Sequence, residues 1–201
     1  YIIPENKSPS VNARLLESLQ RPFAEELPHL DYLDQYLDFV LPVVRHFGED
    51  LQESHFYLGR PWLEIRDDDH FHDAVLHFFN EPNEYIRSVN GNVSRGTWRF
   101  LGATNKFIID HQEKKDAITS ELYDLAYLDG QFFILRKHGD QPSLGNPKYF
   151  LMVIESQGRG LSWLDAVELL YNRHRQQRQT YLILTLIALM LIFIALFMWT
   201  Y

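Results

Sequence analysis

The chain has 201 residues, with 19 Lys or Arg against 27 Asp or Glu, which gives a formal net charge of −8, and it contains no cysteine. The acidity argues against a nucleic-acid partner, because such binding needs a basic surface that displaces counterions from phosphates. The lack of cysteine excludes disulfides, thiol catalysis and thiolate metal sites. The length suits one domain with a core of its own and an additional arm.

The N-terminal part divides into an arm and a helical region. Residues 1–12 contain prolines and small polar residues without an apolar period, which predicts an extended arm. Over residues 13–57 apolar side chains recur at helical spacing and prolines interrupt the pattern. We therefore expect several short helices there.

Leucines of this helical region form a candidate contact surface. Leu30, Leu33 and Leu37 recur at a spacing that places them on one helix face. Trp163 begins a second apolar stripe at helical spacing. We interpret Leu30, Leu33, Leu37 and Trp163 as candidate partner-binding residues. For the Trp163 stripe, packing on the protein's own domain is the more common arrangement, and a partner helix is the alternative.

After about residue 58 the apolar period changes to alternation, which predicts a β domain over residues 58–157. Turn-forming residues separate the candidate strands, and Asp129-Gly130 is the strongest hairpin signal. Such a series indicates an antiparallel meander that curls into a barrel or half-barrel. The expected strands are residues 62–66, 74–79, 84–89, 94–101, 106–110, 120–127, 131–137 and 148–155.

Residues 75–139 carry a pattern in which the strand Gly96-Thr97-Trp98 precedes strands of alternating apolar residues. This pattern resembles that of small lipocalin-like β-meander domains. The resemblance implies a calyx-shaped barrel. It does not supply a function, because one fold carries many functions.

The densest polar cluster of the chain surrounds two histidines. His70 and His72 would point to one face of a strand, and Asp69 could join them, which is a conceivable site for zinc or iron. His77 could extend this row, although histidines on a buried face are more often hydrogen-bonded core residues. The alternative is an acidic turn with half-exposed histidines. The chain carries no other catalytic motif that we can identify, and we expect no cofactor.

The C-terminal part predicts one long helix. Ser162 is followed three residues later by Asp165, which is typical of a capped helix start. No Pro or Gly follows Trp163. We expect a juxtamembrane helix over residues 161–180 that continues into a transmembrane helix over residues 181–201, because no charge occurs from residue 181 to 199.

The flanks of this span predict its orientation. Arg173, Arg175 and Arg178 precede it, and positive flanks stay on the cytoplasmic side. Tyr181 and Trp199 would mark the two membrane interfaces. We therefore expect a single-pass, tail-anchored membrane protein whose N-terminal domain lies on the cytoplasmic side. A targeting signal ahead of residue 1 would reverse this orientation.

These observations predict an α+β fold, in which short N-terminal helices precede a β-meander or half-barrel and a long C-terminal helix that spans a membrane. The function we expect is that of a non-enzymatic, membrane-anchored subunit or adaptor, with other membrane protein subunits and the bilayer as partners. The alternative is a lipocalin-like binder of an apolar ligand, or a metal-dependent enzyme at the membrane surface. A filled barrel interior would favour the adaptor, and we expect it to be filled by Trp98, Phe100, Phe107, Phe132 and Leu135.

Overall fold

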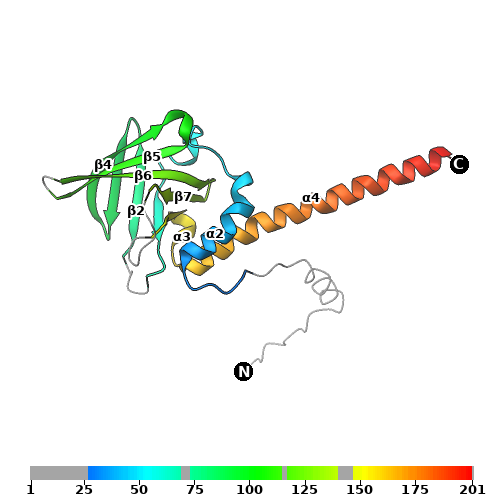
Figure 1. The fold of residues 1–201 in the computed structure, drawn as a ribbon, viewed down its shortest axis with the longest axis horizontal. Helices are drawn as coiled ribbons and strands as arrows, with labels where there is room; N and C mark the ends of the chain where they lie inside the picture. The colour runs from blue at the N-terminus through cyan, green and yellow to red at the C-terminus, as the bar shows by residue number, and fades with distance from the viewer. Residues whose placement is uncertain (1–26, 69–72, 115–116, 140–146, 201) are drawn as a thin grey trace, which may run out of the picture.

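The computed structural model describes residues 27–68, 73–114, 117–139 and 147–200. A β-barrel forms most of this part of the chain, and a long helix extends away from it (Figure 1). The barrel consists of β1 Trp62–Ile65, β2 Val75–Asn80, β3 Glu84–Val89, β4 Asn92–Leu101, β5 Lys106–Lys114, β6 Ala117–Leu128, β7 Phe132–Lys137 and β8 Tyr149–Ile154.

Each strand pairs antiparallel with the next one in sequence, and β8 pairs with β1, so the barrel is closed. The positions of all eight strands and their meander order confirm the prediction from alternation. The half-barrel and the α+β class that we expected are wrong. Pairing from Trp62↔Ile154 to Ile65↔Leu151 joins the two outermost strands, which removes the exposed sheet edges that a half-barrel would keep.

Short helical elements occur before, between and after the strands. The helix α2 spans Leu33–Val44, and α3 is a single turn at Glu155–Gly158. Three-residue 3-10 helices occur at Arg45–Phe47, Ser54–Phe56 and Gly102–Thr104. The expected arm over residues 1–12 and the helices before residue 27 lie outside the described residues.

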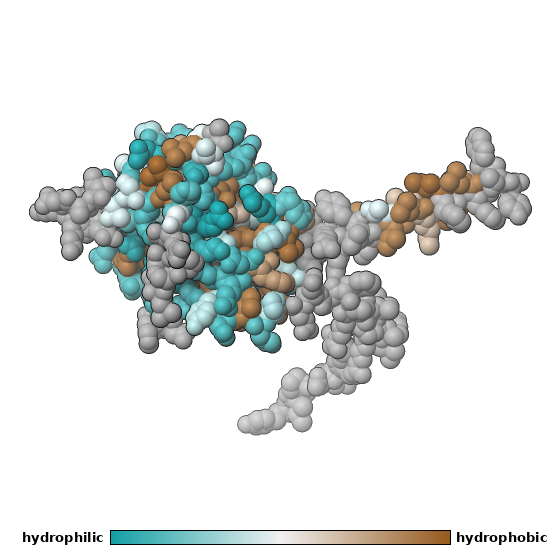
Figure 2. All heavy atoms as spheres, viewed as in Figure 1, coloured by the Kyte–Doolittle hydropathy of each residue, from teal (hydrophilic) through white to brown (hydrophobic). Residues whose placement is uncertain are grey.

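The helix α4 spans Trp163–Thr200 without a break, as the absence of Pro and Gly predicts. At its start, the side chain of Ser162 accepts a hydrogen bond from the backbone N–H of Asp165, and Asp165 Oδ2 accepts one from the backbone N–H of Ser162. This reciprocal pair satisfies N–H groups that a helix start leaves unpaired. In Figure 2 the far half of α4 shows apolar side chains at its surface.

Crossing the hydrocarbon layer of a bilayer takes about 20 consecutive apolar helical residues. Within the residues that the structure describes, no helix is both long enough and apolar enough to do so. This finding contradicts the expected transmembrane helix over residues 181–201. It also contradicts the expected single-pass placement, with the N-terminal domain on the cytoplasmic side of a membrane.

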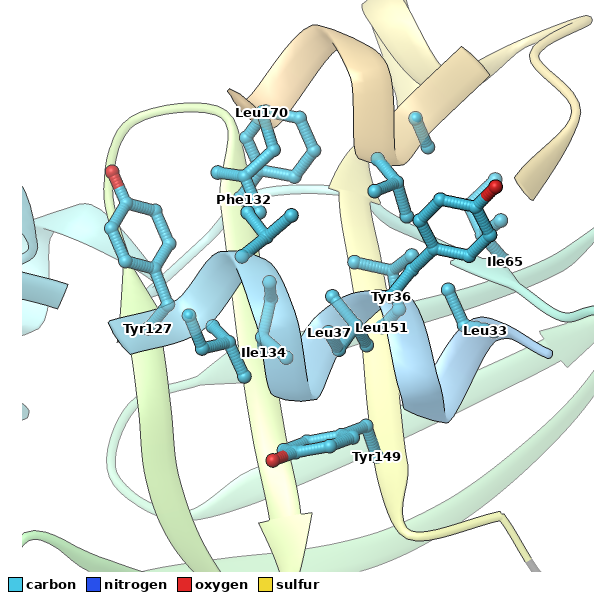
Figure 3. Close-up of a cluster of buried hydrophobic side chains, with 14 of the residues drawn as sticks. Leu33, Tyr36, Leu37, Ile65, Tyr127, Phe132, Ile134, Tyr149, Leu151 and Leu170 are labelled. Atoms are coloured by element: carbon cyan, nitrogen blue, oxygen red, sulfur yellow. The ribbon is translucent and has the colours of Figure 1, made fainter. Parts of the chain in front are cut away.

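Two hydrophobic cores lie on the two faces of the barrel wall. Alternation along the strands sends one set of side chains inward and the other outward. The outer core joins the barrel wall to α2 and the first turns of α4, and Figure 3 shows side chains of both helices gathered with those of β7 and β8. The inner core fills the barrel, and its buried members include Trp62, Phe79, Trp98, Phe107 and Phe133.

Candidate functional site

The residues predicted to bind a metal lie outside the described part of the chain. These are Asp69, His70 and His72, between β1 and β2. Among the residues that are described, no group of three or more His, Asp or Glu side chains is placed to hold a metal ion. The metal site therefore stays a prediction.

The predicted partner-binding residues lie where α2 meets α4. Leu33 and Leu37 are buried in the outer core, and Leu30 is half-buried against it. The ring of Trp163 packs edge-on against Tyr36, with 5.6 Å between the ring centroids. The structure thus places all four residues in the protein's own packing, and their contact with a partner stays a prediction.

The residues predicted to flank a membrane all lie in α4. Of these, Arg173 has a described side chain, and its Nη1 atom lies 3.8 Å from Asp129 Oδ2 in the turn between β6 and β7. The side chains of Arg175, Arg178, Tyr181 and Trp199 lie outside the described ones. Arg173 therefore contacts the protein's own barrel. The role expected for these residues was to flank a transmembrane helix, and that helix is contradicted.

Aromatic side chains close one end of the barrel. Tyr57 lies in the segment that precedes β1, and its ring packs against Trp98, Phe107 and Phe133 at centroid distances of 5.6–5.7 Å. Its hydroxyl group donates a hydrogen bond to the carbonyl oxygen of Leu51, which is also buried. This arrangement, which we call the aromatic plug, leaves its members almost without solvent contact.

The expected filling of the interior is correct for three of the five residues. Trp98, Phe107 and Leu135 are buried in the inner core, and Phe100 is only partly buried against it. Phe132 was placed wrongly, because it belongs to the outer core. Its strand partner is Val153, which also faces outward, and directly opposite residues share a face of the sheet.

Beyond the aromatic plug the barrel interior becomes polar. His77 in β2 is 2% exposed, and its two ring nitrogens have different partners. Nδ1 lies 2.7 Å from the hydroxyl group of Tyr85, and Nε2 lies 3.1 Å from Oε2 of Glu64. The other oxygen of Glu64, Oε1, accepts a hydrogen bond of 2.5 Å from Nε of Arg66. We call Glu64, His77 and Tyr85 the buried triad.

The protonation states of the buried triad follow from its surroundings. Burial lowers the pKa of His77. The hydrogen bond that His77 donates to Glu64 raises it, but does not compensate for the effect of burial. Burial raises the pKa of Glu64, but the hydrogen bonds from His77 and Arg66 outweigh this effect and lower it. Near neutral pH His77 is therefore neutral and Glu64 ionised. The ionised carboxylate can only accept, so Nε2 of His77 carries the proton and Nδ1 accepts the Tyr85 O–H.

A half-buried carboxylate, that of Glu121 in β6, also faces the interior, because Glu121 is paired with the buried Ile109. The Tyr123 hydroxyl donates a hydrogen bond of 2.6 Å to Oε2 of Glu121, and Nζ of Lys137 lies 3.0 Å from Oε1. Burial raises the pKa of Glu121, and these two partners more than reverse the effect. The pKa of Tyr123 is raised by burial and by the Glu121 charge. Glu64 and Glu121 therefore each have a cation and a hydroxyl or imidazole donor of their own.

A groove of about 460 Å³ reaches Glu64 from outside the barrel. It lies where β1 and β2 diverge, since their pairing comprises only Trp62↔His77 and Leu63↔Leu76. The turn between α3 and α4 forms its other side, where Glu155 and Arg159 form an ion pair. The groove has mixed polar and apolar walls.

Sequence reasoning did not single out Glu64 or Tyr85. For His77 it left open a metal site and a hydrogen-bonded core histidine, and in the structure His77 is a buried, hydrogen-bonded histidine. Alternation alone could have predicted that Glu64 faces inward, because it follows the inward-facing Trp62 by two residues. It could also have placed Tyr85 in a strand. Which inward residues meet across the barrel depends on strand register, and register is set by pairing partners far apart in the sequence.

Comparisons of this chain with family models, with curated proteins and with solved structures found no match.

Proposed function

We propose that the chain is a non-enzymatic subunit of a larger protein assembly, which it joins by the far half of α4. The observation that carries this proposal is a run of exposed large apolar side chains on that part of the helix. These are Leu184, Leu186, Ile187, Leu189, Met190, Leu191, Ile192, Ile194, Leu196 and Met198.

Their exposure is unusual for a folded protein. Leu186 is 66% exposed and Met190 is 68% exposed, one helical turn apart. Scattered apolar residues are normal at a surface, but a contiguous apolar stretch marks a site of association. Covering a stretch of this size contributes on the order of 10 kcal/mol. That figure is comparable with the roughly 4–15 kcal/mol that association costs in lost freedom, so additional contacts would make the complex stable.

The barrel and α2 hold the first turns of α4 in a fixed position. The first turns of α4 are buried against α2 and the barrel wall through Ala166, Val167 and Leu170. Arg173 adds a contact to the barrel turn at Asp129. Figure 1 shows α4 leaving the barrel as a straight extension. A helix held at its base presents its far half to a partner in a defined direction.

The barrel interior supports this proposal over a calyx for an apolar ligand. In a ligand-holding barrel the depth of the interior would stay open. Here the aromatic plug occupies it, and Trp62, Phe107 and Phe133 have no solvent exposure. An apolar ligand would have to displace several packed rings.

Site-specific photo-cross-linking in cells that produce the full chain tests the proposal. A photoreactive amino acid replaces Leu186 in one variant and Met190 in a second. The matched control places it at Val93, which is also apolar and 63% exposed but lies alone in the β3–β4 hairpin. We expect both α4 positions to cross-link to the same protein, and the control not to do so.

A second measurement ties the cross-link to the apolar contact. The substitutions Leu186→Asp and Met190→Asp together should abolish copurification of the cross-linked protein, while Val93→Asp should leave it intact. Cross-links from α4 to lipid alone, or to a second copy of this chain alone, would overturn the proposal. So would copurification that survives the double substitution.

A further inference from the structure

The barrel interior has a polar end, opposite the aromatic plug, where solvent reaches inward-facing side chains. Arg87, His111 and Lys137 face inward there. Arg87 is directly opposite His77, and Lys137 is directly opposite Tyr123. His111 is opposite Gly96, which is in turn opposite Tyr85. All three are half-buried, whereas the members of the aromatic plug are almost fully buried. Arg66 follows Glu64 at the same end.

Among the described side chains of the strands that face into this end, the charges do not balance. Arg66 is paired with Glu64, and Lys137 is paired with Glu121. Arg87 is different, because no described residue offers its guanidinium group a hydrogen bond or an ion pair. The two carboxylates are thus matched by two cations, and the charge of Arg87 is left over.

Arg87 lies close to the buried triad. It is directly opposite His77 in the β2–β3 pairing, and its charge lowers the pKa of both His77 and Tyr85. His77 is neutral, and the proton of the Tyr85 hydroxyl is directed to His77, so neither group neutralises the guanidinium. A half-buried arginine in this setting attracts an anion.

An apolar surface lies beside this charge. Phe150 in β8 faces inward, since it is opposite Leu135, and it is half-buried. Its ring stands edge-on to the imidazole of His77, with 4.9 Å between the centroids. A flat apolar group could lie against Phe150 while an anionic group reaches Arg87.

We infer that the polar end of the barrel binds a small carboxylate with a flat apolar body, whose carboxylate group is held by Arg87. The planar guanidinium group presents two parallel N–H donors that match the two oxygens of a carboxylate. The aromatic plug limits the ligand to a compact one, because a long chain would find the depth of the barrel filled. This inference concerns residues other than those of α4, so it is independent of the proposed function.

Equilibrium dialysis of the full chain against labelled benzoate, at constant ionic strength, tests this inference. Arg87→Gln removes the charge, and Arg95→Gln is the matched control. Arg95 lies in the same hairpin, opposite Ile86, and is exposed on the outer face of the barrel. We expect the unsubstituted chain and Arg95→Gln to bind one equivalent, and Arg87→Gln to bind at least tenfold more weakly, since a hydrogen bond to a charged group is lost.

Two further measurements sharpen the result. Unlabelled benzylamine has the same ring with a cation, and it should not compete. Arg87→Lys keeps the charge without the planar pair of donors, so it should bind several-fold more weakly than the unsubstituted chain, and it replaces Arg87→Gln if circular dichroism shows that variant to be unfolded. The inference is overturned if benzoate does not bind saturably, if Arg87→Gln and Arg95→Gln bind alike, or if inorganic phosphate competes as well as unlabelled benzoate.

Discussion

The Nη1 atom of Arg173 lies 3.8 Å from the Oδ2 atom of Asp129, which links α4 to the turn between β6 and β7. Asp129 also organises that turn. Its Oδ1 atom accepts hydrogen bonds of 2.7 Å from the backbone N–H groups of Gln131 and Phe132, and its Oδ2 accepts one from the hydroxyl group of Tyr127. The carboxylate therefore serves the hairpin and the helix together.

Replacement of Asp129 by Ala should lower the free energy of unfolding by about 2–4 kcal/mol, because buried donors lose a charged acceptor. Chemical unfolding of both proteins measures the difference. Arg173→Ala should cost under about 1 kcal/mol, since that ion pair is long and half-exposed.

Asp50 provides the matched control for this prediction. Its Oδ1 atom accepts a hydrogen bond of 2.8 Å from the backbone N–H of Gln52, but at an exposed position. Asp50→Ala should cost under about 1 kcal/mol. Equal costs at Asp50 and Asp129 would show that burial of the turn does not strengthen the carboxylate's contribution.

The buried triad predicts how stability depends on pH. The pKa of His77 is lower in the folded protein than in the unfolded chain, where it is about 6.5. Below about pH 6.5, His77 of the unfolded chain binds a proton, whereas His77 of the folded protein stays neutral. The free energy of unfolding should therefore fall as the pH drops below about 6.5, by at most about 1.4 kcal/mol per pH unit from this group. Glu64 acts in the same direction at lower pH, because its pKa is also lowered from 4.5.

Unfolding free energies at pH 7.5 and 5.5 measure this effect. His77→Gln should reduce the difference between the two values, whatever it does to stability at pH 7.5. His55→Gln is the control, because His55 is exposed and lies outside the barrel interior. A pH difference that His77→Gln leaves unchanged would contradict the assignment of a neutral, buried imidazole.

Gly96 occupies a point of close approach between β4 and β5. A Cβ atom at this position would lie 2.1 Å from the carbonyl oxygen of Asp110 and 3.1 Å from the ring of Tyr85. Gly96→Ala should therefore force the strands apart and cost at least about 2 kcal/mol of unfolding free energy. This finding gives a packing reason for the glycine in the Gly96-Thr97-Trp98 pattern.

Gly130 is the matched control for that substitution, because a Cβ atom there would meet only Nη1 of Arg60, at 3.9 Å. Gly130→Ala should change the midpoint of thermal unfolding by no more than a few degrees. If Gly96→Ala were equally mild, the close approach to Asp110 would have to relax without cost.

Local patterns predicted the elements of this fold well and their inward or outward faces less well. Between Leu125 and Tyr127 the register of β6 shifts at a bulge. One extra residue moves every later side chain to the other face, so Tyr127 packs outside the barrel and Leu128 inside. A sequence pattern read by alternation does not reveal such a bulge. In β7, Phe132 and Leu135 lie three residues apart, so they face opposite sides of the wall, and only Leu135 faces inward.

The sequence by itself determined where the eight strands and α4 lie, because alternation, turn residues and the lack of Pro or Gly act over a few neighbouring residues. It did not determine that β8 closes on β1, that Leu33 and Leu37 pack on the barrel wall, or that Glu64, His77 and Tyr85 meet inside it. Those contacts join residues from separate elements. Their geometry depends on strand register and on burial, and only the folded chain sets both.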